Sequence, residues 1–204
     1  MANIRFDSKR NLLALLLAVF AFALLTISVF ASQDKMLRQE ISFVSNGNLL
    51  KGVLVTPAGN TAAPCLVFVH GSGATPRDNF GYYKPYWQRF AQKGWCSLSW
   101  DKPGVGASEG DWQLQSMDDR AMEVSAAMDF LRSRPGMKDT PIGVIGISQA
   151  GWVMPKLSAM RNDLAFIISI SGAIDWMEQS RYSGDIRLKS EGYSPQEIRR
   201  IKLF

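Results

Sequence analysis

Ser148 has the setting of a nucleophile at a sharp turn between a strand and a helix. Gly146 stands two residues before it, and Ala150 and Gly151 stand just after it, where the apolar run 142–147 ends. A serine lifted out of such a turn requires very small neighbours, because larger side chains would clash with the flanking strand or helix. The pattern predicts that Ser148 is a nucleophile; the alternative is a serine that only caps the following helix.

The segment His70-Gly71-Ser72-Gly73 follows an earlier apolar run, residues 66–69. Backbone N–H groups in such a loop can bind a negatively charged oxygen, and the unpaired N–H groups at a helix N-terminus can do the same. The position after an earlier strand is where the oxyanion loop of a serine hydrolase belongs. The loop and the helix after the serine therefore favour acyl-transfer chemistry over simple helix capping.

A third glycine-rich segment, residues 101–110, begins with Asp101 at the end of an apolar run and contains Gly104, Gly106 and Gly110. A glycine-rich loop after a strand is also how a dinucleotide site begins. A dinucleotide site is disfavoured, because Gly110 lies one residue beyond the position that the motif requires for its third glycine. In addition, no helix begins directly after the loop.

From about residue 40 to about residue 173, the sequence resembles the α/β-hydrolase superfamily in its secreted esterase and prolyl-peptidase-like branches. Three motifs carry the resemblance in the order that the superfamily has them, at 70–73, 101–110 and 146–152. The resemblance implies hydrolysis of carboxylic ester or peptide-like acyl bonds in small-molecule or peptide substrates. No metal or organic cofactor is implied, because acyl transfer at an oxyanion hole needs none.

Carried over by residue, the resemblance makes Ser148 the nucleophile and assigns the oxyanion hole to the backbone N–H groups of Gln149 and Ser72. His70 falls in the oxyanion loop by the same correspondence. The loop that starts at Asp101 becomes a structural turn near the mouth of the site, because an acid at a strand end usually holds a turn.

A general base for the serine is missing from the sequence. In this superfamily the base is a histidine that follows the nucleophile and an acid, whereas the only histidine, His70, precedes Ser148. Lys156 lies eight residues past the serine, about 12 Å away along a helix, and Asp175 has no histidine to orient. We expect an N-terminal portion of a hydrolase, truncated after the sixth strand, with little or no turnover; the alternative is a non-catalytic binding protein that retains a hydrolase half-fold.

Apolar runs alternate with amphipathic segments, and Asn46-Gly47 marks a hairpin turn near the start. Strands are predicted at 39–44, 49–56, 66–69, 95–100, 142–147 and 164–170, and helices at 83–90, from Ser116 to before Pro135, and at 149–160. This alternation predicts an α/β fold with a mostly parallel sheet and helices on both faces. Residues 32–204 form one domain in this interpretation, with the last 30 or so starting a lid.

Residues 1–31 have the layout of a signal peptide: basic residues, an apolar stretch and a small-residue end at Ala31. The apolar stretch, residues 12–30, is also nearly long enough to cross a bilayer, so an uncleaved membrane anchor is the alternative interpretation. Either way we expect an exported protein, periplasmic or extracellular, or one anchored at the membrane. The net charge of +5 includes no long run of like charges, which disfavours a nucleic-acid partner.

Two pairs of residues leave alternatives open. Cys65 and Cys96 are interpreted as separate buried small hydrophobes, although an oxidising compartment would permit a bond between them. Trp112 and Trp152 either line a hydrophobic entrance or belong to the core, and the core is favoured because large aromatic side chains are usually buried.

Overall fold

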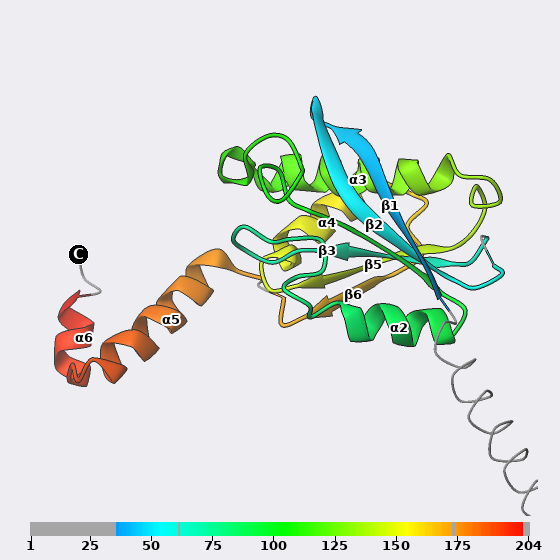
Figure 1. Ribbon diagram of the computed structural model, residues 1–204. Helices are drawn as coiled ribbons and strands as arrows, with labels where there is room; N and C mark the ends of the chain where they lie inside the picture. Colours follow the sequence, from blue (N-terminus) through cyan, green and yellow to red (C-terminus); the bar gives the residue numbers. More distant parts are fainter. Residues whose placement is uncertain (1–35, 61, 173, 202–204) are drawn as a thin grey trace, which may run out of the picture.

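The computed structural model describes residues 36–201 with the exception of 61 and 173 (Figure 1). The segment expected to be a signal peptide or anchor, residues 1–31, lies outside the described residues. Within the described part of the chain, no helix is both long and apolar enough to cross a membrane.

Six strands form one sheet in the order β1-β2-β4-β3-β5-β6. The strands are β1 (Met36–Ser45), β2 (Asn48–Pro57), β3 (Cys65–Val69), β4 (Cys96–Trp100), β5 (Ile142–Ile147) and β6 (Ile167–Ile170). β1 and β2 pair antiparallel, β2 and β4 pair antiparallel, and the remaining neighbours are parallel. The predicted α/β fold with a mostly parallel sheet is confirmed.

The entry hairpin turns at the predicted dipeptide. Asn46 has φ 49° and Gly47 has φ 77°, and both values lie in the left-handed region that a type I′ turn requires. Glycine and asparagine tolerate that region better than other residues do, which explains why the chain reverses here.

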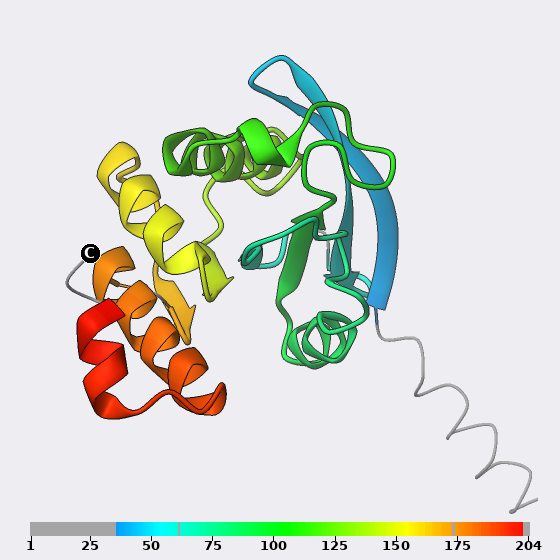
Figure 2. The same ribbon diagram turned by 90° about the vertical axis from the view of Figure 1, so that its left-hand side faces the viewer.

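Helices cover both faces of the sheet (Figures 1 and 2). The helices are α2 (Lys84–Gln92), α3 (Met117–Arg132), α4 (Ala150–Met160), α5 (Trp176–Ser190) and α6 (Pro195–Ile201), with a 3-10 turn at Trp112–Leu114. α3 and α4 pack on one face and α2 packs on the other, whereas α5 and α6 extend away from the sheet (Figure 1).

The side chains of β3 alternate between two hydrophobic clusters, one on each face of the sheet. Val67 and Val69 belong to the cluster under α3 and α4, whereas Leu66 and Phe68 join the cluster under α2. Because successive side chains of a strand point to opposite faces, a strand covered on both faces must be apolar at every position. The continuous apolar runs of the sequence are therefore explained.

The predicted N-terminus of α3 is confirmed as a capping box. The Ser116 hydroxyl accepts from the Asp119 N–H at 3.1 Å, and the Asp119 carboxylate accepts from the Ser116 N–H at 2.8 Å. This arrangement pairs two of the backbone groups that a helix end leaves unsatisfied.

The interpretation of the two cysteines as separate residues is wrong. Cys65 pairs directly opposite Cys96 where β3 and β4 run in parallel, and a disulfide joins them across a Cα–Cα distance of 4.5 Å. Both side chains are buried. Strand register, which the sequence alone does not reveal, brings residues 31 positions apart into bonding range.

The sixth strand is shorter than predicted, since regular pairing begins only at Ile167. The residues before it are held by a charged turn in which Arg161 and Arg132 both bond the Asp163 carboxylate. Leu164 precedes the strand and is partly buried against the main core.

Candidate active site

Ser148 occupies a strained turn between β5 and α4. Its φ is 55°, a value that residues other than glycine rarely adopt. The Ser148 N–H donates to the Ile170 carbonyl at 3.0 Å, and its own carbonyl accepts from the Gly151 N–H at 2.9 Å. Because such a conformation costs free energy, it persists only where neighbouring structure enforces it, and these two bonds do so.

Gly146 explains why small residues flank the serine. A Cβ atom built at this position would lie 2.6 Å from Met154 Sδ and 2.7 Å from Ala150 Cβ. α4 therefore crosses β5 so closely that no side chain fits at position 146. The predicted steric reason for glycine holds in the structure.

The alternative that Ser148 only caps α4 is wrong. The cap position of α4 is Gln149, and no side chain caps this helix end. In the first turn, the Gly151 and Trp152 N–H groups bond back to the Ser148 and Gln149 carbonyls at 2.9 and 3.1 Å, and this end of the helix stands next to the serine.

The loop at 70–73 lies directly beside Ser148. A Cβ built on Gly71 would come within 3.3 Å of the Ile147 carbonyl and 3.6 Å of Ser148 Cβ. Gly71 thus permits a close approach of two backbone segments. Ser72, the next residue, lines the same cavity as Ser148.

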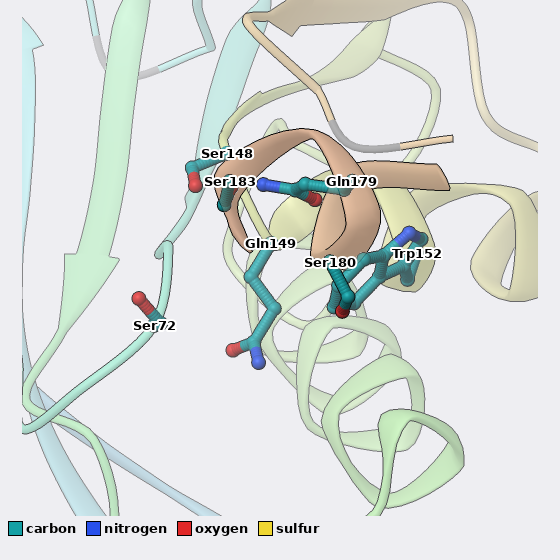
Figure 3. A pocket seen from close by; sticks show the side chains of 7 residues that line it. All are labelled: Ser72, Ser148, Gln149, Trp152, Gln179, Ser180 and Ser183. Atoms are coloured by element: carbon teal, nitrogen blue, oxygen red, sulfur yellow. The ribbon is translucent and has the colours of Figure 1, made fainter. Parts of the chain in front are cut away.

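That cavity has a volume of about 250 Å³ and is lined by Ser72, Ser148, Gln149, Trp152, Gln179, Ser180 and Ser183 (Figure 3). The last three come from α5, whose first turns lie over the mouth of the site. No motif marks them in the sequence, where they belong to a polar stretch expected only to begin a lid.

A second cavity of about 380 Å³ adjoins the first and shares Gln149 and Trp152 with it. Met117 and Ile174 complete its mostly apolar lining. Trp152 is half-buried and lines both cavities, so the preference for a core position is wrong for this residue, whereas its place at a hydrophobic entrance stays a prediction.

His70 is buried, with 2% of its surface exposed, and both ring nitrogens have partners. Nε2 lies 2.6 Å from the Trp100 carbonyl and Nδ1 lies 3.1 Å from the Tyr83 hydroxyl. A carbonyl only accepts, so Nε2 carries the proton, and Nδ1 accepts from the hydroxyl. Burial lowers the pKa of His70 to about 3, which keeps the ring neutral.

The other residues weighed for chemistry hold structure instead. The Asp101 carboxylate accepts from the Arg77 backbone N–H at 2.6 Å and from its guanidinium at 2.8 Å, as expected for an acid that holds a turn. Lys156 forms an exposed ion pair with Asp118 at 2.8 Å. Asp175 caps α5 by accepting from two N–H groups of its first turn.

Two buried cations stand behind the loop at 70–73, and sequence reasoning missed both. Lys102 Nζ donates to the Gly71 carbonyl at 2.6 Å and to the Gly73 carbonyl at 2.9 Å. Arg120 donates to the His70 carbonyl and also to Gln149 Oε1, the latter at 2.7 Å. A basic residue in a loop and another in a helix resemble solvent-exposed charges when only the sequence is known.

A buried carboxylate balances part of this positive charge. Glu123 is 4% exposed and accepts from the Trp100 indole N–H and the Gln115 amide. Burial raises its pKa, and the same desolvation lowers the pKa of Lys102 to about 7. The Lys102 ammonium also lies 5.6 Å from the centre of the Trp112 ring.

Comparison with known proteins agrees with this geometry. Residues 46–198 match the model of the X-Pro dipeptidyl-peptidase (S15) family. The quorum-quenching protein AidA of Acinetobacter baumannii is 28% identical over 131 residues, which cover 64% of this chain and 42% of AidA. The chain thus spans less than half the length of that relative.

Solved structures share the fold. The α/β hydrolase GrgF from a Penicillium species superposes with a TM-score of 0.61 at 23% identity, covering 76% of this chain and 53% of GrgF. The esterase Pf2001 of Pyrococcus furiosus superposes with a TM-score of 0.62 at 18% identity, covering 82% of this chain and 60% of the esterase. The strand order, the turn at Ser148 and the match over 46–198 lead to one conclusion: this chain belongs to the X-Pro dipeptidyl-peptidase (S15) family of the α/β-hydrolase superfamily.

Proposed function

We propose that this chain carries the nucleophile and oxyanion hole of a serine hydrolase that cleaves carboxylic ester or peptide-like acyl bonds. The observation that carries the proposal is the strained turn at Ser148, whose φ of 55° lifts the serine into the cavity it shares with Ser72. Ser148 Oγ attacks the acyl carbonyl in this mechanism, and the leaving group departs when the tetrahedral intermediate collapses.

The backbone N–H groups of Ser72 and Gln149 stabilise the negative oxygen of that intermediate. Gln149 stands at the start of α4, where the helix dipole favours an anion. Loss of one oxyanion donor typically costs about 2.7–4 kcal/mol of transition-state stabilisation.

The general base comes from outside these 204 residues. His70, the only histidine of the sequence, is neutral and bonded at both nitrogens to Trp100 and Tyr83. We therefore expect poor turnover by residues 1–204 alone, and acylation that accelerates when a soluble base is added.

Small organic esters or amides with one apolar group suit the site. The mostly apolar cavity at Met117, Trp152 and Ile174 adjoins the nucleophile and offers a place for that group. Gln179 and Ser183 of α5 offer polar contacts in the cavity that contains the serine.

A fluorophosphonate ester tests whether Ser148 is a nucleophile. In the expected reaction Ser148 Oγ attacks the phosphorus and fluoride leaves. The proton of the serine hydroxyl passes to added imidazole. We expect labelling at Ser148, accelerated by imidazole and absent in Ser148→Ala, with the modified residue identified by peptide mass spectrometry. Ser133→Ala, a change at an exposed serine far from the cavity in sequence, is the matched control. Labelling that is equal in Ser148→Ala would refute the proposal.

Binding without turnover is the second candidate function, and the sequestered His70 favours it. Saturable binding of an ester or amide by the chain that persists in Ser148→Ala, with no imidazole-dependent labelling of the wild type, would favour this candidate over the first.

We also propose that the protein is exported, or anchored by residues 12–30 with its folded part outside the cytoplasm. The disulfide between Cys65 and Cys96 supports this proposal, because such bonds persist mainly in oxidising compartments. Cell fractionation with a C-terminal tag tests it; recovery of the protein solely from the cytosol would contradict it.

A further inference from the structure

We propose that Lys102 and Arg120 are positioning residues that aim and polarise the peptide group between Gly71 and Ser72, which supplies one donor of the oxyanion hole. This inference rests on the proposed function of Ser148. It goes beyond that function by assigning a role to two buried cations outside the cavity.

The argument begins with the carbonyl groups of the loop. All four, from residue 70 to residue 73, accept hydrogen bonds from side chains. Arg120 donates to His70, Arg120 and Lys102 donate to Gly71, and Lys102 donates to Gly73, while the single hydroxyl proton of Thr75 is shared between the Ser72 and Gly73 carbonyls. Because charged donors hold the carbonyls of residues 70, 71 and 73, the peptide planes of this short loop have little freedom to rotate.

The second step concerns the peptide unit that joins Gly71 to Ser72. Its carbonyl oxygen accepts from Lys102 Nζ at 2.6 Å and lies 3.4 Å from Arg120 Nη2. The C=O and N–H of a trans peptide point in opposite directions. Holding the carbonyl toward the cations therefore directs the Ser72 N–H away from them.

The third step is polarisation. A positive charge at a carbonyl oxygen draws electron density from the amide nitrogen, which makes the N–H of the same peptide a stronger donor. Both cations are buried, so water screens this effect only weakly. The Ser72 N–H would then bind a developing oxyanion more tightly than an ordinary loop N–H.

Arg120 extends this arrangement to the second donor residue. Its Nη1 donates to Gln149 Oε1 at 2.7 Å, while its other nitrogen holds the loop at His70. One guanidinium thus connects the two segments that carry the proposed oxyanion donors. Its planar fork suits two simultaneous bonds in fixed directions.

Nuclear magnetic resonance of the chain tests the positioning directly. Lys102→Met should move the Ser72 amide proton and the Gly71 carbonyl carbon upfield, because both lose the effect of a charged hydrogen bond. Lys102→Arg should restore much of the shift, and Lys156→Met, at an exposed lysine paired with Asp118, should leave both signals unchanged.

The wild-type chain offers the same test without any substitution. The Ser72 amide should titrate with a midpoint near 7, the pKa that burial gives Lys102, and Lys102→Met should abolish this titration. The charged and titratable groups that face Lys102 are His70, Arg120 and Glu123, and all three remain in the variant.

Fluorophosphonate labelling of Ser148 with added imidazole measures the consequence for reactivity. Lys102→Met and Arg120→Met should slow labelling by about 10-fold to 100-fold, less than or comparable to the loss of a whole donor. Lys102→Arg and Arg120→Lys should recover part of the rate, and Lys156→Met should match the wild type.

The outcomes separate the two proposals. Unchanged Ser72 and Gly71 signals in Lys102→Met, or an unchanged labelling rate with Ser148 still modified, would overturn the positioning role alone. Absence of labelling at Ser148 in the wild type would refute the proposed function, and the resonance signals would still decide whether the cations orient the peptide.

Discussion

Gly146 lies against Met154, so that a Cβ atom on the glycine would come 2.6 Å from the methionine sulfur. The contact fixes how closely α4 crosses the end of β5. The same contact fixes the position of the turn at Ser148 relative to the sheet, because β5 and α4 meet at this turn.

Gly146→Ala should therefore destabilise the fold by about 1–3 kcal/mol, the usual cost of forcing an extra carbon into a packed core. The flexible Met154 can move, but Ala150 Cβ at 2.7 Å cannot move without shifting α4. Urea denaturation measures the change, and fluorophosphonate labelling should fall with it. Gly184→Ala, on the exposed helix α5 with nothing within 4 Å, is the control and should cost nothing; equal effects of the two changes would count against this explanation.

The disulfide should contribute about 2–4 kcal/mol to the free energy of unfolding, because it constrains a loop of about 30 residues in the unfolded chain. Cys65→Ala combined with Cys96→Ala should lower the melting temperature. A reductant should lower the wild type to the same value and leave the double variant unchanged. Free thiols that react in the denatured wild-type chain without reductant would show that the bond is absent.

Lys102 should make stability depend on pH. Its pKa is lowered from 10.5 to about 7 in the folded chain, so the unfolded chain holds one more proton between these values. Stability therefore rises as pH increases through this window, by up to about 1.4 kcal/mol per pH unit, and the cost of burying the charge is present in full below pH 7. Lys102→Met removes this dependence.

Urea denaturation at pH 6 and pH 9 checks the expectation. The stability of Lys102→Met relative to the wild type should be more favourable at pH 6 than at pH 9. Lys156→Met should show no such difference, and the same result for both variants would rule out Lys102 as the source.

The edge strand β6 should promote self-association of residues 36–201. Ile167 and Ile168 are 40% and 37% exposed, and among the described strands only β5 pairs with β6. Unpaired apolar edges invite pairing between chains. Ile168→Lys should reduce concentration-dependent light scattering, whereas Leu114→Lys, at a more exposed apolar residue outside the sheet, should not; a monodisperse wild-type chain would contradict the prediction.

The sequence predicts the parts of this molecule that depend on local pattern. The turn at Asn46-Gly47, the capping box at Ser116 and the small residues around Ser148 all follow from short-range sterics and hydrogen bonding. The fold class follows because a strand buried on both faces must be apolar throughout.

The parts that depend on long-range register could not be predicted in this way. Arg120 meets the loop at His70 across 50 positions of sequence, and Cys65 meets Cys96 only because two strands pair in one register. The contribution of α5 to the cavity depends on the direction that this polar helix takes after β6. No periodicity in the sequence specifies that direction.

The bond from the Ser148 N–H to the Ile170 carbonyl ties the turn at Ser148 to β6, an edge strand of the sheet. The serine can keep its strained shape only while the end of β6 stays docked, so fraying of that edge would let the turn relax. Hydrogen exchange at the Ser148 amide should then report the rate at which the end of β6 at Ile170 opens, so this one proton measures how firmly the edge of the sheet is held beside the candidate site.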